Sequence, residues 1–210
     1  APDDRYPDST FVEGAAILAA AAGIWTLPGA SERRGAVAAL KDALRLDHGS
    51  LLPARTFSIA SPGTFDGGDV CQIEDRFLIG ISERTNEAGA HQLAEVLELL
   101  GFEAETVDIR GLPGLLHLKS GLSYLGGHVA LAVDAMARHP ALNGVRAIVP
   151  PAGEEYASNC VPLDGRRLLF AHGFPILAHI LKSEGFELIE ADMSEFRKMD
   201  GGLSCLSLRF

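Results

Sequence analysis

One stretch of the sequence occurs twice in similar form, as Leu93-Ala-Glu-Val-Leu-Glu-Leu-Leu-Gly-Phe-Glu103 and as Leu177-Ala-His-Ile-Leu-Lys-Ser-Glu-Gly-Phe-Glu187. In both copies apolar residues recur at the spacing of a helix, which predicts an amphipathic helix with one buried face. The glycines that follow, Gly101 and Gly185, stand where a helix C-terminus favours a left-handed residue. The likeness of the two copies indicates an internal repeat that contains a helix followed by a strand.

Shorter similarities extend this repeat. Gly121-Leu-Ser-Tyr-Leu125 resembles Gly202-Leu-Ser-Cys-Leu206, and Thr10-Phe-Val-Glu-Gly14 resembles Thr64-Phe-Asp-Gly-Gly68. Apolar runs bounded by turn residues predict two strands before each helix. The sequence therefore predicts four strand–strand–helix–strand units, with strands at 9–12, 15–19, 24–27, 56–60, 69–73, 76–81, 105–109, 122–125, 129–133, 146–149, 160–163, 167–171 and 187–191, and helices at 31–46, 87–100, up to about 138, and 175–184.

The repeat also predicts how the units assemble. Helices that cannot bury their apolar faces within one unit must pack against the next, and a ring of units closes its sheet edges as propellers do. We therefore expect an α/β fold, a propeller of repeated ββαβ units, with residues 1–210 forming a single domain. A last predicted strand, 203–208, begins a unit that the sequence does not complete, and the first residue is Ala1 rather than Met. We expect a segment before Ala1 to fill this incomplete unit.

Composition and charge disfavour several classes of protein. With 18 Lys plus Arg and 28 Asp plus Glu, the formal net charge is −10, which repels phosphate backbones and argues against nucleic acid as a partner. The longest apolar stretch, 15–25, is shorter than the roughly 20 residues that span a bilayer, and no secretory signal opens the chain. We therefore expect a cytoplasmic protein without a membrane partner.

Three cysteines without a CxxC spacing disfavour a disulfide framework and a structural zinc site.

In a ring of repeats, residues at equivalent positions converge on the axis. The polar residues at or beside the first strand of a unit are Glu13, Asp66, Asp69, His117 and Cys205. A thiol, an imidazole and carboxylates in one place are the composition of a nucleophilic site, in which the thiolate attacks and the imidazole moves protons. The sequence therefore predicts a catalytic centre near the axis of the propeller.

Each of these residues also has a purely structural interpretation. Cys205 lies on an apolar segment and could be a small buried side chain, as we expect for Cys71 and Cys160. His117, within Leu-Leu-His-Leu, could be a hydrogen-bonded core histidine, and the segment 66–69 could be an acidic turn. The catalytic interpretation depends on Cys205 and His117 occurring together.

Six motifs follow one another along the whole chain. They are Tyr6-Pro-Asp-Ser-Thr-Phe-Val-Glu13, Phe65-Asp-Gly-Gly-Asp-Val70, Ser82-Glu-Arg-Thr-Asn86, Leu116-His-Leu-Lys-Ser-Gly121, Ala157-Ser-Asn-Cys160 and Asp200-Gly-Gly-Leu-Ser-Cys-Leu-Ser-Leu-Arg-Phe210. Their order and spacing resemble those of the dimethylarginine dimethylaminohydrolases, members of the guanidine-modifying superfamily. The resemblance implies the five-bladed α/β propeller, or pentein fold, of that superfamily, with one unit incomplete in this sequence.

The resemblance also implies roles for individual residues. Cys205 corresponds to the nucleophile, His117 to the general acid and base, and Asp66 to the catalytic carboxylate. The implied substrate-binding residues are Asp8, Phe11, Glu13, Arg33, Arg84 and Met199. Of these, Arg33 and Arg84 would hold the α-carboxylate of an amino-acid substrate, and the backbone carbonyl of Met199 would face its α-amino group.

The implied activity is hydrolysis of Nω,Nω-dimethyl-L-arginine and Nω-monomethyl-L-arginine to L-citrulline and dimethylamine or methylamine, through a covalent thiouronium on the cysteine. A guanidinium is planar, charged and rich in N–H donors, so Asp66 and Glu13 suit it. The forked guanidinium groups of Arg33 and Arg84 suit a carboxylate better than lysine would, although solvated arginines near helix starts are the favoured interpretation when these residues are taken alone. The expected partner is the methylated arginine, and no metal or organic cofactor is expected.

Some alternatives stay open. Gly14 stands where the family has an acid after Glu13, which leaves substrate affinity and the preferred methylation undecided. Arginine deiminases and amidinotransferases use the same Cys–His–acid set, although the extra helical bundle typical of arginine deiminases is not visible here. A non-catalytic binding protein on the same propeller is a further alternative, which Cys205 and His117 disfavour. The sequence also leaves open whether the chain forms a homodimer.

Overall fold

The computed structural model describes residues 6–46 and 55–209 of the chain. Within these ranges it contains four three-stranded sheets, each formed by strands that are consecutive in the sequence. In every sheet the first two strands pair antiparallel, and the third pairs parallel with the second after a helical connection. The predicted repeat of ββαβ units is therefore confirmed.

The bounds of the four units follow the predicted ones within a few residues. The first unit contains β1 (Ala16–Ala19), β2 (Ala22–Trp25), α1 (Arg34–Leu46) and β3 (Arg55–Ser58). The second contains β4 (Val70–Ile73), β5 (Arg76–Ile81), α2 (Glu87–Leu99) and β6 (Glu103–Asp108). The third contains β7 (Leu122–Gly126), β8 (Val129–Ala132), α3 (Asp134–Ala137) and β9 (Arg146–Ile148). The fourth contains β10 (Val161–Asp164), β11 (Arg167–Ala171), α4 (Pro175–Ser183) and β12 (Glu187–Ala191), and α5 (Ser194–Arg197) follows it.

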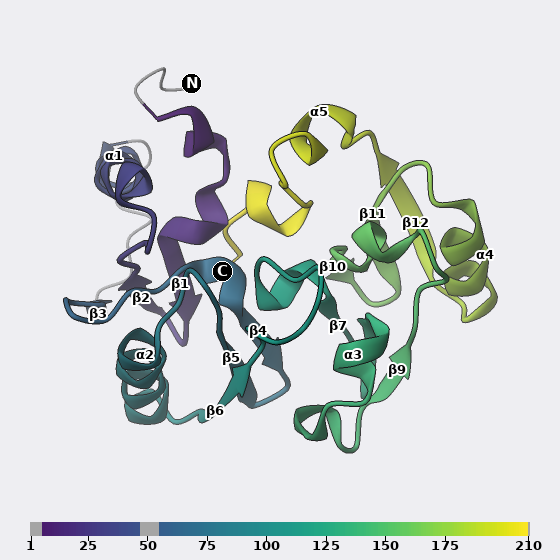
Figure 1. Ribbon diagram of the computed structural model, residues 1–210, viewed down its shortest axis with the longest axis horizontal. Coiled ribbons are helices and arrows are strands. Elements are labelled where there is room, and N and C mark those ends of the chain that lie inside the picture. The colour runs from purple at the N-terminus through teal and green to yellow at the C-terminus, as the bar shows by residue number, and fades with distance from the viewer. Residues whose placement is uncertain (1–5, 47–54, 210) are drawn as a thin grey trace.

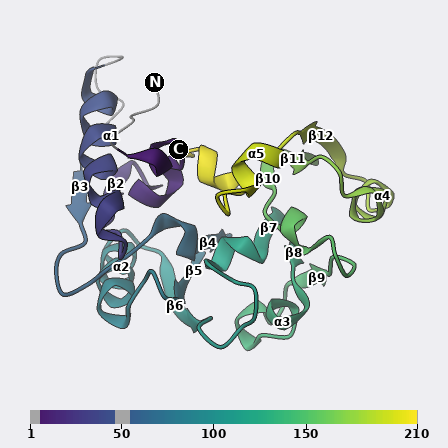
Figure 2. The ribbon, with the colours of Figure 1, turned by 45° about the horizontal axis from the view of Figure 1, so that its top comes forward.

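The units follow one another along an arc, with their helices toward its outer side (Figure 1). The first strands of neighbouring units, β4 with β7 and β7 with β10, pack together on the inner side of the arc. The C-terminal segment, yellow in Figure 2, returns to the inner side and lies next to the purple N-terminal segment. Residues from both ends of the chain therefore meet beside the innermost strands.

Each hydrophobic core lies between two neighbouring units. On β5, Phe77 and Ile79 pack into the core shared with the first unit, whereas Leu78 packs into the core shared with the third. On β8, Ala130 faces the second unit and Leu131 faces the fourth. This alternation follows from the period of two in a strand, which sends successive side chains to opposite faces of a sheet. Both faces of the inner sheets are thus buried, as the repeat predicted.

The predicted strand at 9–12 is wrong. The chain forms two short 3-10 helices there, η1 (Pro7–Thr10) and η2 (Val12–Ala15). Proline fixes φ near the helical value and is favoured in the first turn, and the amide of Phe11 then donates to the carbonyl of Asp8 at 2.9 Å. The backbone groups that a strand would offer to a sheet are used within the turn.

The predicted strand at 203–208 is also wrong. Its middle forms a 3-10 turn, η8 (Ser204–Leu206), in which the amide of Cys205 donates to the carbonyl of Gly202 at 3.2 Å. The amide of Ser204 donates instead to the side chain of Asn159 at 2.8 Å. A short apolar run does not reveal such a side-chain partner, and its periodicity is ambiguous. Residues 203–208 therefore do not begin another sheet within the described part of the chain.

Candidate active site

Short 3-10 turns bring the polar residues to the inner side of the arc. One such turn precedes the first strand of each unit: η2 before β1, η4 (Gly67–Asp69) before β4, η5 (Leu118–Ser120) before β7 and η7 (Glu155–Ser158) before β10. The turn η2 packs against η4, η4 against η5, η5 against η7, and η8 packs against η2. In or next to these turns lie the five residues predicted to converge, Glu13, Asp66, Asp69, His117 and Cys205.

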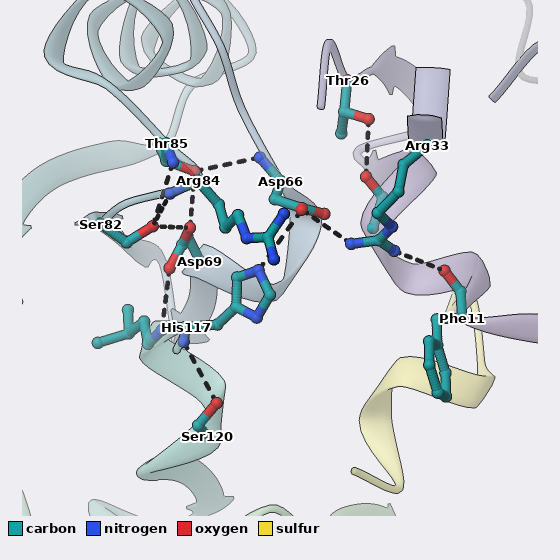
Figure 3. A network of polar contacts seen from close by, with 12 residues as sticks. Phe11, Thr26, Arg33, Asp66, Asp69, Ser82, Arg84, Thr85, His117 and Ser120 are labelled. Carbon is teal, nitrogen blue, oxygen red and sulfur yellow. Dashed lines mark hydrogen bonds and ion pairs between the residues drawn. The ribbon is translucent and has the colours of Figure 1, made fainter. Parts of the chain in front are cut away.

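Asp66 occupies the middle of the polar network in Figure 3. Its side chain is 1% exposed, and its Oδ2 accepts a hydrogen bond from Nη1 of Arg33 at 2.9 Å. The same oxygen lies 3.5 Å from Nε2 of His117, which is longer than a normal N–H···O bond and makes this an electrostatic contact. The side chain of Arg84 also points toward the carboxylate (Figure 3). The carboxylate is therefore surrounded by one imidazole and two guanidinium groups.

These charges shift the pKa of both Asp66 and His117. Burial opposes ionisation of Asp66, but the contact with His117 and the charges of His117, Arg33 and Arg84 outweigh it and lower the pKa of the carboxyl. Burial likewise opposes protonation of His117, but the contact with Asp66 and the charges of Asp69 and Asp66 raise the pKa of the imidazole. The pair therefore favours a carboxylate beside an imidazolium, a form able to donate a proton.

Asp69 is a buried acceptor that fixes the loops around this pair. Its Oδ2 accepts hydrogen bonds from the hydroxyl groups of Ser82 and Thr85, both at 2.7 Å, and its Oδ1 accepts from the amide of Leu118 at 3.0 Å. The hydroxyl of Thr85 in turn accepts a bond from the amide of Asp66 at 3.1 Å. Burial raises the pKa of Asp69, against these hydrogen bonds. Three hydrogen bonds thus engage the Asp69 carboxylate, and Asp69 influences the Asp66–His117 pair through the residues that donate them.

The two glycines between Asp66 and Asp69 allow the close approach of neighbouring units. A Cβ at Gly67 would lie 2.1 Å from the carbonyl oxygen of Glu13, and a Cβ at Gly68 would lie 2.9 Å from Cγ of His117. Any larger residue would therefore push the first unit or the imidazole away. The close packing of Glu13 and His117 against these positions explains the two glycines more specifically than an acidic turn does.

Glu13 is tied to two other parts of the site. Its Oε1 forms an ion pair with Nζ of Lys119, and its Oε2 accepts a hydrogen bond from the hydroxyl of Ser204 at 2.7 Å. The residue is 6% exposed, so these partners satisfy a charge that would be costly to bury alone. Glu13 therefore links the first unit, the third unit and the C-terminal turn.

Cys205 and His117 line the same cavity, which has a volume of about 590 Å³. Glu13 also lines it, so three of the nine predicted site residues line this cavity. The Sγ of Cys205 accepts a hydrogen bond from the amide of Gly202 at 3.4 Å. Burial, reinforced by the negative charge of Glu13, raises the pKa of the Cys205 thiol. The thiol is therefore protonated at neutral pH in the described structure.

The other predicted residues lie outside the lining of this cavity. Arg33 and Arg84 approach Asp66, and the carbonyl of Phe11 accepts a 3.4 Å bond from Nη2 of Arg33. Asp8 is half-buried in η1, and the side chain of Met199, after α5, is 46% exposed. The structure thus brings Arg33, Arg84 and Phe11 to the carboxylate, and it does not bring Asp8 or Met199 into the polar network of the described residues.

Sequence reasoning assigned no role to Asn159, which holds the turn that carries the thiol. Its Oδ1 accepts from the amide of Ser204 at 2.8 Å, and its Nδ2 donates to the carbonyl of Lys119 at 2.9 Å and to the hydroxyl of Ser204 at 3.0 Å. The asparagine is 6% exposed. The only signal in the sequence was its place in the motif 157–160, since its partners lie far away along the chain.

Replacing Asn159 with alanine is expected to cost about 1–3 kcal/mol of unfolding free energy, because a buried amide loses its acceptor. Because the turn also positions Cys205, kcat is expected to fall by about 10- to 100-fold. Urea unfolding and a turnover assay measure the two effects. The exposed Asn143 provides a control, and its replacement by alanine should change neither. Equal kcat for the two variants would contradict a positioning role for Asn159.

The remaining cysteines and the helices add no further chemistry to the site. Cys71 is buried in β4 and Cys160 is buried just before β10, and burial raises the pKa of Cys160 to about 12. Among the residues that the structure describes, no group of three or more histidine, cysteine or acidic side chains is placed to hold a metal ion. None of the helices within those residues combines the length and apolar character needed to cross a membrane.

Comparison with known proteins shows which protein families this chain is similar to. A family model described as arginine deiminase matches residues 55–118. The chain is 37% identical to the N(G),N(G)-dimethylarginine dimethylaminohydrolase of Pseudomonas aeruginosa over 209 residues, which cover 100% of this chain and 79% of that one. It is 36% identical to the enzyme of the same name from Streptomyces coelicolor, over 99% of this chain and 76% of that one.

Solved structures agree with the sequence relatives. The Pseudomonas aeruginosa enzyme, as a cysteine-to-serine variant in complex with citrulline, superposes with a TM-score of 0.91 and covers 100% of this chain and 79% of that chain. The N-terminal domain of ArgZ, an arginine dihydrolase, shares the fold at 18% identity, with a TM-score of 0.80 over 99% of this chain and 77% of that one. The expected α/β-propeller class, the pentein fold, is thereby confirmed. This chain belongs to the dimethylarginine dimethylaminohydrolase family.

Proposed function

We propose that this chain hydrolyses Nω,Nω-dimethyl-L-arginine and Nω-monomethyl-L-arginine to L-citrulline and dimethylamine or methylamine. The observation that carries the proposal is that Cys205 and His117 line one cavity, with Asp66 beside the imidazole. A thiol, a proton donor and a carboxylate that suits a guanidinium are the groups that such a reaction requires. Family membership over the whole length of the chain supports the same substrate class.

The reaction begins with binding of the substrate guanidinium next to Asp66. A cation in the cavity lowers the pKa of the Cys205 thiol, which burial and Glu13 otherwise raise, so the thiol releases its proton to solvent and becomes the nucleophilic thiolate. The thiolate attacks the central carbon of the guanidinium. Resonance makes that carbon a poor electrophile, so holding it against the sulfur is a large part of catalysis, of the order of 7–11 kcal/mol for well-oriented groups.

His117 then acts as acid and as base. The imidazolium, favoured by Asp66 and Asp69, donates its proton to the departing methylated amine, and the C–N bond breaks to leave a thiouronium on Cys205. The neutral imidazole next takes a proton from water, and the water oxygen attacks the same carbon. The C–S bond breaks, the thiol is restored, and citrulline leaves. No metal or organic cofactor takes part in these steps.

The remaining assignments of the proposal concern the amino-acid end of the substrate. We assign its α-carboxylate to Arg33 and Arg84, and its α-amino group to the backbone carbonyl of Met199. We also assign Asp8 and Phe11, both in the N-terminal segment, to substrate binding. In this proposal residues 1–210 work as one catalytic domain, and the protein is cytoplasmic.

A substrate panel tests the proposal. We expect citrulline together with dimethylamine from asymmetric dimethylarginine, citrulline together with methylamine from monomethylarginine, and at least about tenfold lower kcat/KM for arginine, because the departing ammonia lacks the methyl contacts. Product amines are separated by chromatography. Citrulline from arginine alone would replace the proposal with an arginine deiminase activity. Transfer of the amidino group to an added amine, without citrulline, would replace it with an amidinotransferase.

A further inference from the structure

The guanidinium of Arg33 bonds to Asp66, the carboxylate to which the proposed function assigns the substrate guanidinium. Its Nη1 donates to Oδ2 of Asp66 at 2.9 Å, and its Nη2 donates to the carbonyl of Phe11 at 3.4 Å. The two side chains of the pair are 14% and 1% exposed, so the contact is shielded from water. A charge-assisted bond in such a place is stronger than one on the surface, and a ligand must displace it to use the same oxygen.

Gly14 makes this contact possible. A Cβ at position 14 would lie 2.5 Å from Nη2 of Arg33 and 2.5 Å from Oδ1 of Asp66, well inside van der Waals contact. The backbone there has little room to move away, because the hydroxyl of Thr26 donates to the carbonyl of Gly14 at 2.7 Å. Gly14 is not among the residues with positive φ, so its backbone accepts other residues. The glycine therefore serves to leave space for the arginine.

The other groups of the site leave Asp66 as the carboxylate for which the guanidinium groups compete. Glu13 is engaged by Lys119 and Ser204. Asp69 is engaged by three donors, as described above. Within the described residues, Oδ1 of Asp66 and Nε2 of His117 are buried and have no hydrogen-bond partner. One oxygen of the Asp66 carboxylate is thus held by the protein's own guanidinium, and the other is buried without a hydrogen-bond partner.

We infer that Gly14 and Arg33 form a selectivity device, in which Arg33 acts as an internal competitor that only a guanidine carrying a carboxylate displaces efficiently. This inference rests on the proposed function. A simple guanidinium that removes Arg33 from Asp66 leaves a buried arginine without an anion, which is costly. An amino-acid guanidine offers Arg33 its own α-carboxylate in exchange, so the ion pair is replaced rather than lost. The device therefore disfavours small guanidines.

Two ligands and two variants test the inference. The 210-residue chain carrying Cys205→Ser, which cannot turn over, is titrated by calorimetry with N,N-dimethylguanidinium and with asymmetric dimethylarginine. Adding Gly14→Ala or Arg33→Gln removes the competitor, so each is expected to bind N,N-dimethylguanidinium about tenfold or more tightly than the parent. With dimethylarginine, Arg33→Gln is expected to bind about tenfold or more weakly, because the α-carboxylate loses its partner, whereas Gly14→Ala retains that partner and is expected to bind dimethylarginine more tightly than Arg33→Gln does.

Matched controls distinguish loss of the Arg33–Asp66 ion pair from the general effects of removing an arginine or adding a Cβ. Arg34→Gln removes the neighbouring exposed arginine, and Gly111→Ala adds a Cβ at a glycine with nothing within 4 Å. Neither should change the affinity for either ligand. If Gly14→Ala does not fold, as judged by circular dichroism, Arg33→Gln alone decides. Unchanged or weaker binding of N,N-dimethylguanidinium by Arg33→Gln overturns the inference. Failure of the parent chain with intact Cys205 to hydrolyse dimethylarginine would instead overturn the proposed function.

Discussion

Cys205→Ser is expected to lower kcat for citrulline release from dimethylarginine by about 10⁴-fold or more, since removing a nucleophile from a catalytic set has effects of this size. A hydroxyl of similar volume keeps the turn η8 intact, and affinity for the substrate should remain within about tenfold. Serine cannot form the thiouronium, so no covalent adduct should be found by mass spectrometry of the quenched reaction. In the parent, the adduct should map to the peptide that contains Cys205.

The other cysteines provide the control for this result. Cys71→Ser changes a buried thiol on β4 that takes no part in the proposed reaction. Its kcat should stay within about tenfold of the parent, although its unfolding free energy should fall, because a polar group replaces a small apolar one in a core. Equal turnover by Cys205→Ser and the parent would remove the thiol from the mechanism and favour a binding protein on the same fold.

His117→Gln is expected to lower kcat by about 10²- to 10⁴-fold, the range that general acid–base groups contribute. Glutamine keeps a polar side chain of similar reach but cannot supply a proton to the departing amine. The effect should be larger on kcat than on KM, because the imidazole acts on the reacting atoms. His179→Gln, which changes an exposed histidine on α4, should leave both constants unchanged.

The charge of Asp66 predicts the direction in which the kcat–pH profile should shift. Asp66 raises the pKa of His117, so the imidazolium persists to higher pH, and the amine-release step should weaken only as pH rises through that raised pKa. Asp66→Asn removes the negative charge, lowers the pKa of His117, and should move this limb of the kcat profile to lower pH. Profiles of kcat against pH for the parent and the variant measure the shift. A limb that stays in place or moves upward would contradict the pairing.

Much of the fold could be predicted from the sequence because its signals are local. Gly101 and Gly185 have φ values of 91° and 85°, as helix C-termini in a left-handed conformation require. The helices that precede them occupy Glu87–Leu99 and Pro175–Ser183, close to the predicted ranges. Spacing within one turn or one strand is enough to predict such features, and the repeat then predicts the order of the units.

The wrong or incomplete predictions concern contacts between distant residues. The turn at Cys205 is not a strand because Asn159, in another unit, takes the amide of Ser204. The bond from Arg33 to Asp66 was not predicted either, and the missing side chain at Gly14 permits it, while the assignment of Arg33 to an α-carboxylate stays a prediction. No periodicity or local spacing encodes which side chain fills a gap across the site.

The shared cores have a consequence for how the protein can come apart. Every core draws its apolar residues from two consecutive units, so a unit that opened alone would expose half of each core it helps to build. Opening the second unit would thus uncover Ile24 on one side and Leu122 on the other. The energetic penalty spreads to both neighbours, which favours a concerted transition over stepwise peeling. Although it is built from repeats, the molecule is therefore expected to unfold cooperatively rather than one unit at a time.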